Sequence, residues 1–505
     1  MRSHQAIIKK VWQGDGLALI AGAVLPFAFA PFDIVPLAFI APALLMWLWF
    51  GATQGRSVWR GYLFGIGYFG VGVSWVAVSM VRFGGIAMPL ASLLTLLFVL
   101  LWALFPALVA YVTHRWFRTA SPRLLVLFVI PSVWVLTEWI RGWLFTGFPW
   151  LSLGYTQVNG PLYGFSPLLG VYGDSWLTMF GAGVLLLVVS VAGMRQRLQY
   201  LVLFAVLGLV SFLADHIDWA TPKGPPLKAS LLQGNIPQDE KWLPENRQPS
   251  IDLYTRLTVE HWDSDIIVWP ETALPAFFQQ AKTFLSDLAQ DAQKHHSDVL
   301  IGMPVLDASG NKVYYNSLVL LGDPFQIYSK RHLVPFGEYV PLKSLLGGFL
   351  EFFNIPMADF SVGHAEKNTL PVHGLKAGIS ICYEDAFGEE VIEALPQANL
   401  LINVSNDAWF GDSFAPHQHL QMAQMRALET ARPMLRATNN GVSAIIDSHG
   451  NITAVSPQFQ QAVTTGTFQP MSGSTPYVWY GNWLIVSLSS ALLIVLGFRL
   501  RRIRP

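Results

Sequence analysis

The chain has 505 residues, of which 13% are charged and 52% hydrophobic, and its mean hydropathy is +0.41. Soluble domains carry about 25% charged residues, so this composition excludes a wholly soluble protein, a disordered chain, collagen and a coiled coil, and indicates a membrane protein. The 32 Lys and Arg balance the 32 Asp and Glu, which argues against a polyelectrolyte partner such as nucleic acid. The one cysteine, Cys382, excludes an intrachain disulfide.

Long apolar runs predict eight transmembrane helices, each of which needs about 20 residues to cross a bilayer. In chain order the runs are Leu17–Ala30, Ile34–Phe50, Gly61–Met80, Ile86–Thr113, Leu124–Trp139, Trp176–Met194, Leu198–Leu213 and Trp483–Phe498. The first two runs are short, and Pro26, Pro31 and Pro36 lie in or between them. A hairpin through Asp33 makes them two spans, whereas one broken helix would reduce the total to seven.

The distribution of basic residues favours eight spans with the N-terminus in the cytoplasm. In that arrangement fourteen Lys and Arg fall in cytoplasmic segments, and the short loops on the opposite side hold only Arg82 and Arg141. This is the positive-inside bias of membrane proteins, and a seven-span arrangement breaks it. The long segment between the seventh and eighth spans is therefore expected on the non-cytoplasmic side.

Three regions are expected. Residues 1–215 form a membrane domain with seven spans and an interfacial loop at 141–175, residues 216–475 form a soluble domain, and residues 476–505 supply the last span and a basic tail. The loop is rich in Gly, Pro and aromatic residues, which suit the lipid headgroup level, and it is either an interfacial belt or the lining of a lipid-accessible site. The soluble region carries a net charge of −11 and the two membrane regions together +11, so the neutral total conceals two opposite charges.

Strand-like and helix-like runs alternate within residues 216–475. Strands are expected at Ala229–Ile236, Asp265–Trp269, Val299–Val305, Ser317–Leu321, Ile327–Lys330, Ala377–Cys382, Leu400–Val404 and Val442–Asp447. Helices are expected at Pro249–His261, Ala276–His295, Phe387–Ala394 and His417–Arg436. Several strands are apolar throughout, as strands buried on both faces are, so we expect a layered α/β domain with helices outside.

Two charged residues of this domain are candidates for chemistry. Glu271 directly follows a buried strand in the run Val-Trp-Pro-Glu-Thr, and side chains at strand ends line the rim where α/β sites form. Lys330 shares one strand face with Tyr328 and His332 by alternation, and a lysine that faces inward needs a carboxylate partner or a function. Taken singly, Glu271 is better explained as a solvated loop residue, and Lys330 as an ordinary edge-strand charge.

Cys382 is the third candidate, although a lone cysteine is by default a small buried apolar residue. An apolar strand delivers it to a turn, and a helix is expected to begin near Ala386, a placement that can lower the pKa of a thiol. Acidic residues follow directly, so a neighbouring cation such as a lysine would be needed. A thiolate nucleophile requires a base and a donor to the developing oxyanion, roles that Glu271 and Lys330 can fill. Spacing alone does not bring the three residues together.

The order of these motifs resembles the carbon–nitrogen hydrolase, or nitrilase, superfamily. The motifs are Trp-Pro-Glu at 269–271, Tyr-x-Lys-x-His-Leu-Val-Pro-Phe-Gly-Glu at 328–338 and Ile-Cys-Tyr-Glu at 381–384. A fuller resemblance, from the first span to the last, is to the membrane-embedded branch of that superfamily, the apolipoprotein N-acyltransferases. It includes residues 138–143, 146–150, 233–237 with Trp242, 403–412 and 438–441. The resemblance implies an αββα sandwich for the soluble domain and a Glu271, Lys330 and Cys382 triad.

The same resemblance implies a ping-pong acyl transfer in the bacterial inner membrane, with the catalytic domain on the periplasmic side. Cys382 would take the sn-1 acyl chain of a phospholipid, typically phosphatidylethanolamine, as a thioester. It would pass the chain to the α-amine of the diacylglyceryl-cysteine of an apolipoprotein. Glu271 would be the general base and Lys330 the oxyanion stabiliser.

Supporting residues are also implied by the resemblance. Glu338 orients the site near Lys330, Tyr383 and Glu384 flank the nucleophile, and Trp242 belongs to a mobile loop at the substrate entrance. No metal, no other cofactor and no nucleic acid are expected, and the protein is expected to be a monomer.

Three alternatives remain at this point. A membrane-tethered amidase that uses water as its acceptor would carry the same triad, and only the spans and aromatic loops favour acyl transfer over it. A transporter or channel would show charges buried in the membrane, and only Glu138 and Arg82 lie near span ends. His417 and His419 make a poor metal pair, because residues two apart do not share a helix face.

Overall fold

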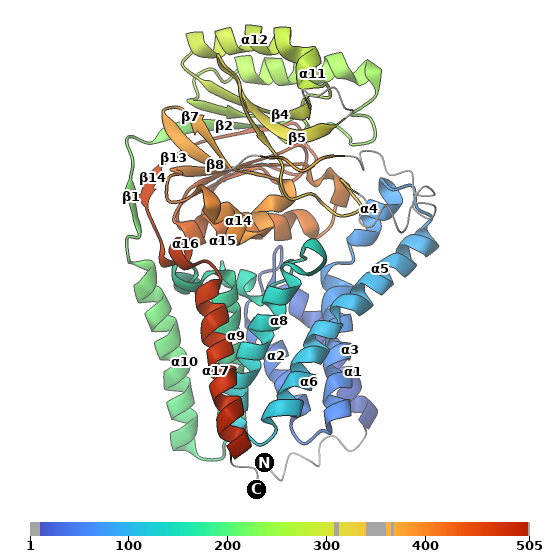
Figure 1. Ribbon diagram of the computed structural model, residues 1–505, viewed down its shortest axis with the longest axis vertical. Coiled ribbons are helices and arrows are strands. Elements are labelled where there is room, and N and C mark those ends of the chain that lie inside the picture. Colours follow the sequence, from blue (N-terminus) through green and yellow to red (C-terminus); the bar gives the residue numbers. More distant parts are fainter. Residues whose placement is uncertain (1–10, 308–312, 340–359, 365–367, 503–505) are drawn as a thin grey trace. The chain divides into compact units, whose positions relative to one another are not determined.

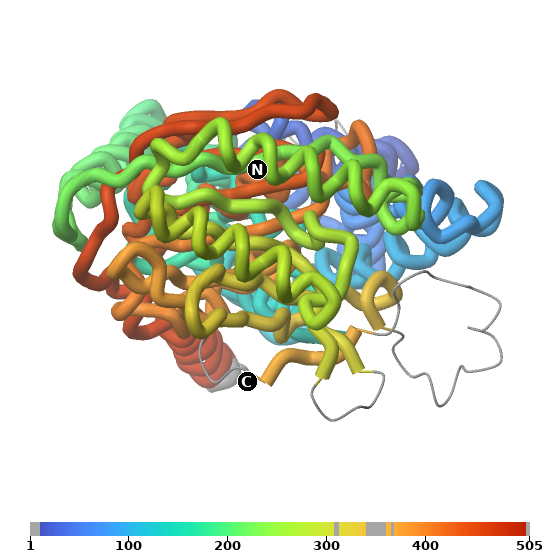
Figure 2. Tube along the Cα trace, turned by 90° about the horizontal axis from the view of Figure 1, so that it is seen from above, coloured from blue at the N-terminus to red at the C-terminus, as the bar shows by residue number. Residues whose placement is uncertain are grey.

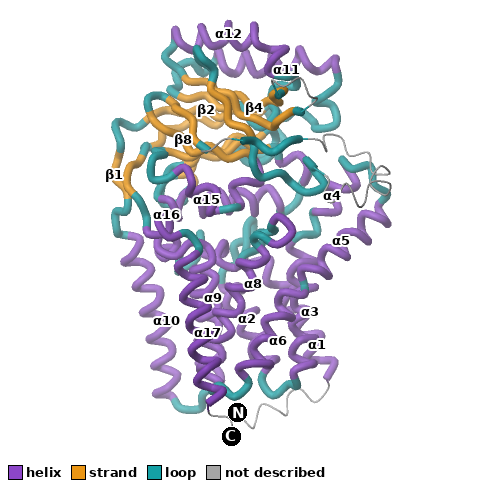
Figure 3. The backbone as a smooth tube through the Cα atoms, in the orientation of Figure 1, coloured by secondary structure: helices purple, strands orange, loops and turns teal. Residues whose placement is uncertain are grey.

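The computed structural model describes residues 11–307, 313–339, 360–364 and 368–502. The chain divides into two compact units (Figure 1). The first comprises the chain up to Ala77, Pro89–Asp218 and the chain from Trp479 onward, and the second comprises Val78–Met88 and Trp219–Val478. Within the described residues the first unit is helical, and the strands belong to the second (Figure 3).

Apart from the three-residue α7, the helices of the first unit are long and apolar. They are α1 (Val11–Val24), α2 (Pro36–Trp49), α3 (Gln54–Gly72), α5 (Met88–Trp102), α6 (Leu104–Phe117), α7 (Pro122–Leu124), α8 (Ile130–Arg141), α9 (Ser166–Ser190), α10 (Met194–Asp215) and α17 (Trp483–Arg502), with α4 (Val76–Arg82) at the boundary between the units. Protein buries only 11% of the most apolar window of α10, which leaves Leu198, Leu201 and Val202 exposed. Apolar side chains left exposed along a helix of this length are suited to lipid, so the protein is a multi-pass membrane protein.

The number of crossings is six or seven by length and composition among the described helices. Six helices are long and apolar enough to cross a membrane, and a seventh crossing results if α3 and α4, which meet at a bend, are one span. All eight predicted spans fall on helices, but the second corresponds to α2, which has 14 residues and is too short to pass the same test. The predicted count of eight is therefore not confirmed.

Glu138 and Arg141, at the end of α8, bind the backbone of the loop that follows. The Glu138 carboxylate accepts hydrogen bonds from Trp134 Nε1 and from the Leu153 amide, both at 2.9 Å. The buried Arg141 guanidinium donates to the Phe148 carbonyl at 2.8 Å and also to the Trp150 carbonyl. These two charged side chains therefore hold the predicted interfacial loop against the end of α8. Such contacts give Glu138 and Arg141 a structural role, which is the alternative to a role in transport.

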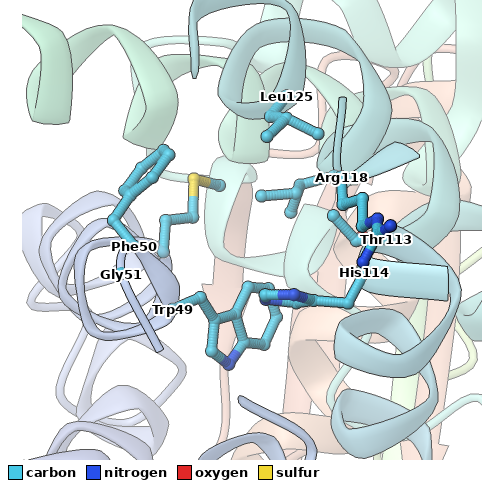
Figure 4. A pocket seen from close by; sticks show the side chains of 9 residues that line it. Trp49, Phe50, Gly51, Thr113, His114, Arg118 and Leu125 are labelled. Carbon is cyan, nitrogen blue, oxygen red and sulfur yellow. The ribbon is translucent and has the colours of Figure 1, made fainter. Parts of the chain in front are cut away.

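A pocket of about 160 Å³ lies at one end of the helical unit, between the ends of α2 and α6 and the start of the segment leading to α8 (Figure 4). Its walls include Trp49, Thr113 and His114, with Arg118 and Leu125 beside them. Arg118 belongs to one of the basic segments predicted to face the cytoplasm.

The second unit contains two six-stranded mixed sheets. The first has the order β13 (Ala462–Phe468), β2 (Leu227–Gln233), β3 (Ile266–Val268), β4 (Asp298–Leu306), β5 (Tyr314–Leu320), β6 (Gln326–Ser329). The second has the order β12 (Ile452–Val455), β11 (Ala444–Ile446), β10 (Met434–Thr438), β9 (Leu400–Ser405), β8 (Leu375–Ile381), β7 (Thr369–Val372). A separate two-stranded sheet pairs β1 (Ala220–Pro222) with β14 (Met471–Gly473). The central strands β2, β3 and β4, and likewise β8, β9 and β10, are parallel.

Side-chain alternation along the strands assembles these sheets into layers. Ala229 and Leu231 of β2 pack with Ile379 and Ile381 of β8 in one core between the two sheets. Leu232, the next residue of β2, instead packs under the helices on the outer face. Those helices are α11 (Pro244–Val259) and α12 (Phe278–Lys294), which lie next to each other in Figure 2. On the outer face of the second sheet lies α15 (Ala415–Thr430). The predicted αββα sandwich is confirmed.

One predicted element of this domain is wrong. The sequence pattern extends a single helix over His417–Arg436, but α15 ends at Thr430 and the chain enters β10 at Met434. Ala431 adopts a left-handed conformation with φ 50°, and Pro433 follows. A left-handed residue breaks the helical hydrogen-bond ladder, and a proline cannot rejoin it.

Candidate active site

Cys382 lies where β8 ends, at the start of a 3₁₀ turn that runs to Ala386. Its backbone is left-handed, with φ 53°, which is unfavourable for a residue with a Cβ. Two donors hold its carbonyl oxygen: Asn403 Nδ2 at 3.3 Å, and His419 Nε2 also at 3.3 Å. The side chain is partly exposed, so a substrate atom can approach it. Burial, the Glu271 carboxylate and Asp407 raise the pKa of the thiol, and Lys330 opposes them.

Glu271 follows β3, as expected, and two contacts fix the backbone segment that precedes it. The indole of Trp269 stacks on Tyr254 and donates to Thr258 Oγ1 at 2.9 Å, which fixes the segment just before it. A Cβ on Gly302 of β4 would lie 2.1 Å from the Pro270 carbonyl, so only glycine allows this close approach. Burial raises the pKa of the Glu271 carboxyl, and Lys330 opposes that effect.

Lys330 follows β6, is fully buried and forms an ion pair with Glu338 at 2.7 Å. Burial lowers the pKa of its ammonium, but the negative charges of Glu338, Cys382 and Glu271 outweigh burial and raise it well above the usual range. Lys330 therefore stays a cation. The same interactions show that Glu271, Lys330 and Cys382 lie within electrostatic range of one another, across the two sheets.

Asn316 of β5 joins the two carboxylates of the site. Its Nδ2 donates to Glu271 Oε1 at 2.6 Å and to Glu338 Oε1 at 3.1 Å. Sequence analysis did not select this residue. The feature that could have identified it is its position inside a strand, where Asn is disfavoured. That feature alone does not distinguish a site residue from a structural one.

Glu384 connects the segment that carries Lys330 to the turn that carries Cys382. Its buried carboxylate accepts hydrogen bonds from the Arg331 amide at 2.6 Å, the Ile381 amide at 2.7 Å and the Tyr328 hydroxyl at 3.0 Å. Since Arg331 is the neighbour of Lys330 and Ile381 that of Cys382, this one carboxylate sets the separation of the two. Burial raises the pKa of Glu384, against the opposing effect of these donors.

Two other predicted site residues lie at the margin of this cluster. Tyr383 is mostly buried, and its ring packs edge-to-face against Phe387 and His332. Trp242 is 38% exposed. Its neighbour Lys241, which sequence analysis also missed, is fully buried and donates to the Glu271 carbonyl at 3.2 Å and to Thr272 Oγ1 at 2.7 Å. The Trp242 loop is thus attached to the backbone of Glu271.

This arrangement can perform nucleophilic acyl chemistry. Such a reaction needs a nucleophile, a proton acceptor and an oxyanion donor, and the candidates for these roles are the thiol on the strained turn, the Glu271 carboxyl with its raised pKa and the buried Lys330 ammonium. A family model described as carbon–nitrogen hydrolase matches residues 228–477, so the second unit is a carbon–nitrogen hydrolase domain. A second model, described as the N-terminal domain of apolipoprotein N-acyltransferase, matches residues 21–184.

Relatives match nearly the whole chain. A protein named apolipoprotein N-acyltransferase from Methylococcus capsulatus is 48% identical over 96% of this chain and 96% of its own length. One of the same name from Coxiella burnetii is 41% identical over 95% of this chain and 99% of its own. The chain therefore belongs to the apolipoprotein N-acyltransferase family. Among solved structures, a nitrilase-superfamily protein from Saccharomyces cerevisiae is 19% identical, with a TM-score of 0.37, and covers 55% of this chain and 96% of its own.

Proposed function

We propose that the protein N-acylates lipoproteins, taking an acyl chain from a membrane phospholipid through a thioester on Cys382. The observation that carries this proposal is the buried cluster in which Glu271, Lys330 and Cys382 interact electrostatically within a domain attached to apolar membrane helices. The names of the relatives support the lipoprotein as acceptor. Both substrates are lipid-anchored, so a catalytic domain attached to the bilayer does not have to extract them.

In the first half-reaction Glu271 takes the thiol proton, and the Cys382 sulfur attacks the sn-1 ester carbonyl of phosphatidylethanolamine. The Lys330 ammonium stabilises the oxyanion of the tetrahedral intermediate. The intermediate collapses with cleavage of the ester C–O bond, and Glu271 returns the proton to the leaving oxygen. A lysophospholipid departs, and the acyl chain remains on Cys382 as a thioester.

In the second half-reaction the α-amine of the diacylglyceryl-cysteine attacks the thioester carbonyl. Glu271 accepts a proton from the amine, the C–S bond breaks, and the proton passes back to the Cys382 sulfur. Glu338 and Asn316 hold Lys330 and Glu271 in place throughout, Glu384 fixes the Cys382 turn, and Tyr383 and Trp242 border the site. By the positive-inside rule the domain faces the periplasm of the bacterial inner membrane.

The test uses purified full-length protein, phospholipid with a labelled sn-1 chain, and a diacylglyceryl peptide. Label on the peptide amine and a labelled thioester on wild-type Cys382 in intact mass spectra are expected, and both are expected to be lost in Cys382→Ala. Peptide N-acylation by a folded Cys382→Ala variant would refute the mechanism. Labelled free fatty acid with no labelled peptide would favour the alternative, a membrane-tethered hydrolase with water as acceptor.

A further inference from the structure

A ring of four buried charges contacts the turn that carries Cys382, and the reaction steps proposed above give it no part. Asp385 and Asp407 each pair with both His419 and Arg436. His419 lies 2.8 Å from Asp385 and 2.9 Å from Asp407, and Arg436 lies 3.1 Å and 3.0 Å from the same carboxylates. All four side chains are at most 1% exposed. We call these four residues the ion-pair ring.

His419 is a cation in this ring. Its Nδ1 faces Asp407 and its Nε2 faces Asp385, and a neutral imidazole has only one N–H to donate. Burial and Arg436 lower the pKa of His419, but the two carboxylates outweigh them and raise it to about 9. Burial raises the pKa of Asp407, but Arg436 and His419 bring it down to about 2. The ring thus contains two positive and two negative charges and is neutral.

The ring is attached to the Cys382 carbonyl by two routes. His419 Nε2 lies 3.3 Å from that oxygen directly. Arg436 Nη1 donates to Asn403 Oδ1 at 2.6 Å, and Asn403 Nδ2 donates to the Cys382 carbonyl at 3.3 Å. These bonds hold a carbonyl whose residue has φ 53°, a conformation that is unfavourable for a residue other than glycine.

The ring also sets part of the electrostatic field at the sulfur. Glu271, Lys330 and Asp407 are the charged groups with the largest effects on the Cys382 thiol. Asp407 disfavours the thiolate, and within the ring its charge is compensated by His419 and Arg436. Loss of the His419 cation would leave the ring with a net charge of −1 beside the nucleophile.

We infer that the ion-pair ring is a positioning device for the nucleophile, which fixes the Cys382 carbonyl and keeps the charge beside the thiol neutral. His419, Asp407 and Arg436 act through Cys382 rather than on a substrate. The inference rests on the proposed function only in taking Cys382 as the nucleophile.

The test measures how the rate of alkylation of Cys382 by iodoacetamide depends on pH, in the purified full-length protein. Cys382 is the only cysteine, so the alkylation reports on it alone. His419→Gln leaves the ring with a net charge of −1 and should raise the pH midpoint of alkylation by about one unit, because a nearby like charge disfavours the thiolate. Asp407→Asn leaves it with +1 and should lower the midpoint. The double variant is neutral again and should return toward the wild type.

Transferase kinetics provide the second measurement. His419→Gln should reduce kcat by about a hundredfold with little change in KM for phospholipid, because a misplaced nucleophile costs rate rather than binding. His417→Gln, which changes a histidine of the same helix outside the ring, is the matched control and should behave as the wild type.

The two variants are expected to shift the alkylation midpoint in opposite directions, which distinguishes an electrostatic effect on Cys382 from general damage to the fold. If Asp407→Asn and His419→Gln move the alkylation midpoint in the same direction, or not at all, the ring has no electrostatic role at the thiol and the inference is wrong. If His419→Gln does not fold, Asp407→Asn still predicts a lowered midpoint and the neutral double variant a midpoint close to that of the wild type. Alkylation requires no acyl donor, so failure of the proposed function in the Cys382→Ala test leaves this test intact.

Discussion

The Asn316 side-chain amide stabilises the negative charge of two neighbouring carboxylates. Its Nδ2 donates to both Glu271 and Glu338, and the Glu338 carboxylate pairs with Lys330. Two acids that share a donor and a cation can lie close together without both being protonated. The amide therefore keeps Glu271 able to accept a proton although burial raises its pKa.

Asn316→Asp should move the acidic limb of the pH–rate profile of acyl transfer to higher pH, by about one unit, because a third carboxylate raises the pKa of Glu271 further. The reaction rate below the new midpoint should fall by about tenfold. Pre-steady-state rates of thioester formation between pH 5 and 9 provide the measurement. Gln248→Glu, an exposed change of the same charge, is the control, and an unmoved limb in Asn316→Asp would contradict a role for Glu271 as base.

Lys241 is a buried ammonium whose pKa is lowered to about 7, because burial disfavours its charge and Glu271 compensates only in part. Between about pH 7 and the unfolded-state value near 10, the folded protein has released this proton and the unfolded chain has not. The unfolded state then binds more protons, so this residue makes stability rise with pH over that window. Below pH 7 both states are protonated and the contribution is constant.

Comparison of Lys241→Met with the wild type isolates this effect, because every other titrating group is shared. The stability of the wild type relative to Lys241→Met should increase between pH 7 and 9.5, as measured by thermal midpoints of the full-length protein in detergent. Lys294→Met removes an exposed ammonium and controls for the loss of one positive charge. A difference that stays constant across the pH range would show that Lys241 does not titrate there.

At the scale of the element, α12 is a helix with one buried face. Leu285 is fully buried with Leu288, in the core that the helix forms with β2, β3 and β4, whereas Lys282 on the same helix is exposed. The apolar spacing of this helix follows the 3.6-residue period, which is why its location could be read from the sequence.

Leu285→Ala should destabilise the domain by about 2–5 kcal/mol, because it removes buried methyl groups and leaves a cavity. Lys282→Ala should change stability by less than about 0.5 kcal/mol. Thermal unfolding of the two full-length variants, followed by circular dichroism, measures the difference. Equal midpoints for the two would mean that α12 does not pack on the sheet.

Helices and strands could be predicted from the sequence where a local pattern of residues defines them. Prediction failed where the structure depends on contacts between residues that are distant in the chain. The predicted helix at α15 reaches Arg436 because its apolar spacing continues through Ala431, although Pro433 is a local signal that a helix ends before it. Only the left-handed conformation of Ala431 has no local signal in the sequence. Glu271, Lys330 and Cys382 were selected as candidates because each sits in a short motif at a strand end. Asn316 was missed, since its contacts depend on the register of β5 against its neighbouring strands.

At the scale of the whole molecule, charge is divided between regions. Residues 216–475 carry −11, and residues 1–215 with 476–505 carry +11. The basic residues concentrate in segments that alternate along the chain with segments of few positive charges, and that alternation predicts which side of the membrane each segment occupies. Gln196, in the first turn of α10, and the exposed surface of α12 are predicted on opposite sides.

Single cysteines introduced into a Cys382→Ser background test this topology, because that background contains no other thiol. Gln290→Cys places a thiol on the exposed face of α12, and Gln196→Cys places one at an exposed position in the first turn of α10. In intact spheroplasts a membrane-impermeant maleimide should label Gln290→Cys. It should label Gln196→Cys only after the membrane is permeabilised, since charged reagents do not cross the apolar core. Labelling of Gln196→Cys alone before permeabilisation would reverse the proposed orientation and place the Cys382 site in the cytoplasm. Labelling of both positions would contradict their predicted separation by the membrane.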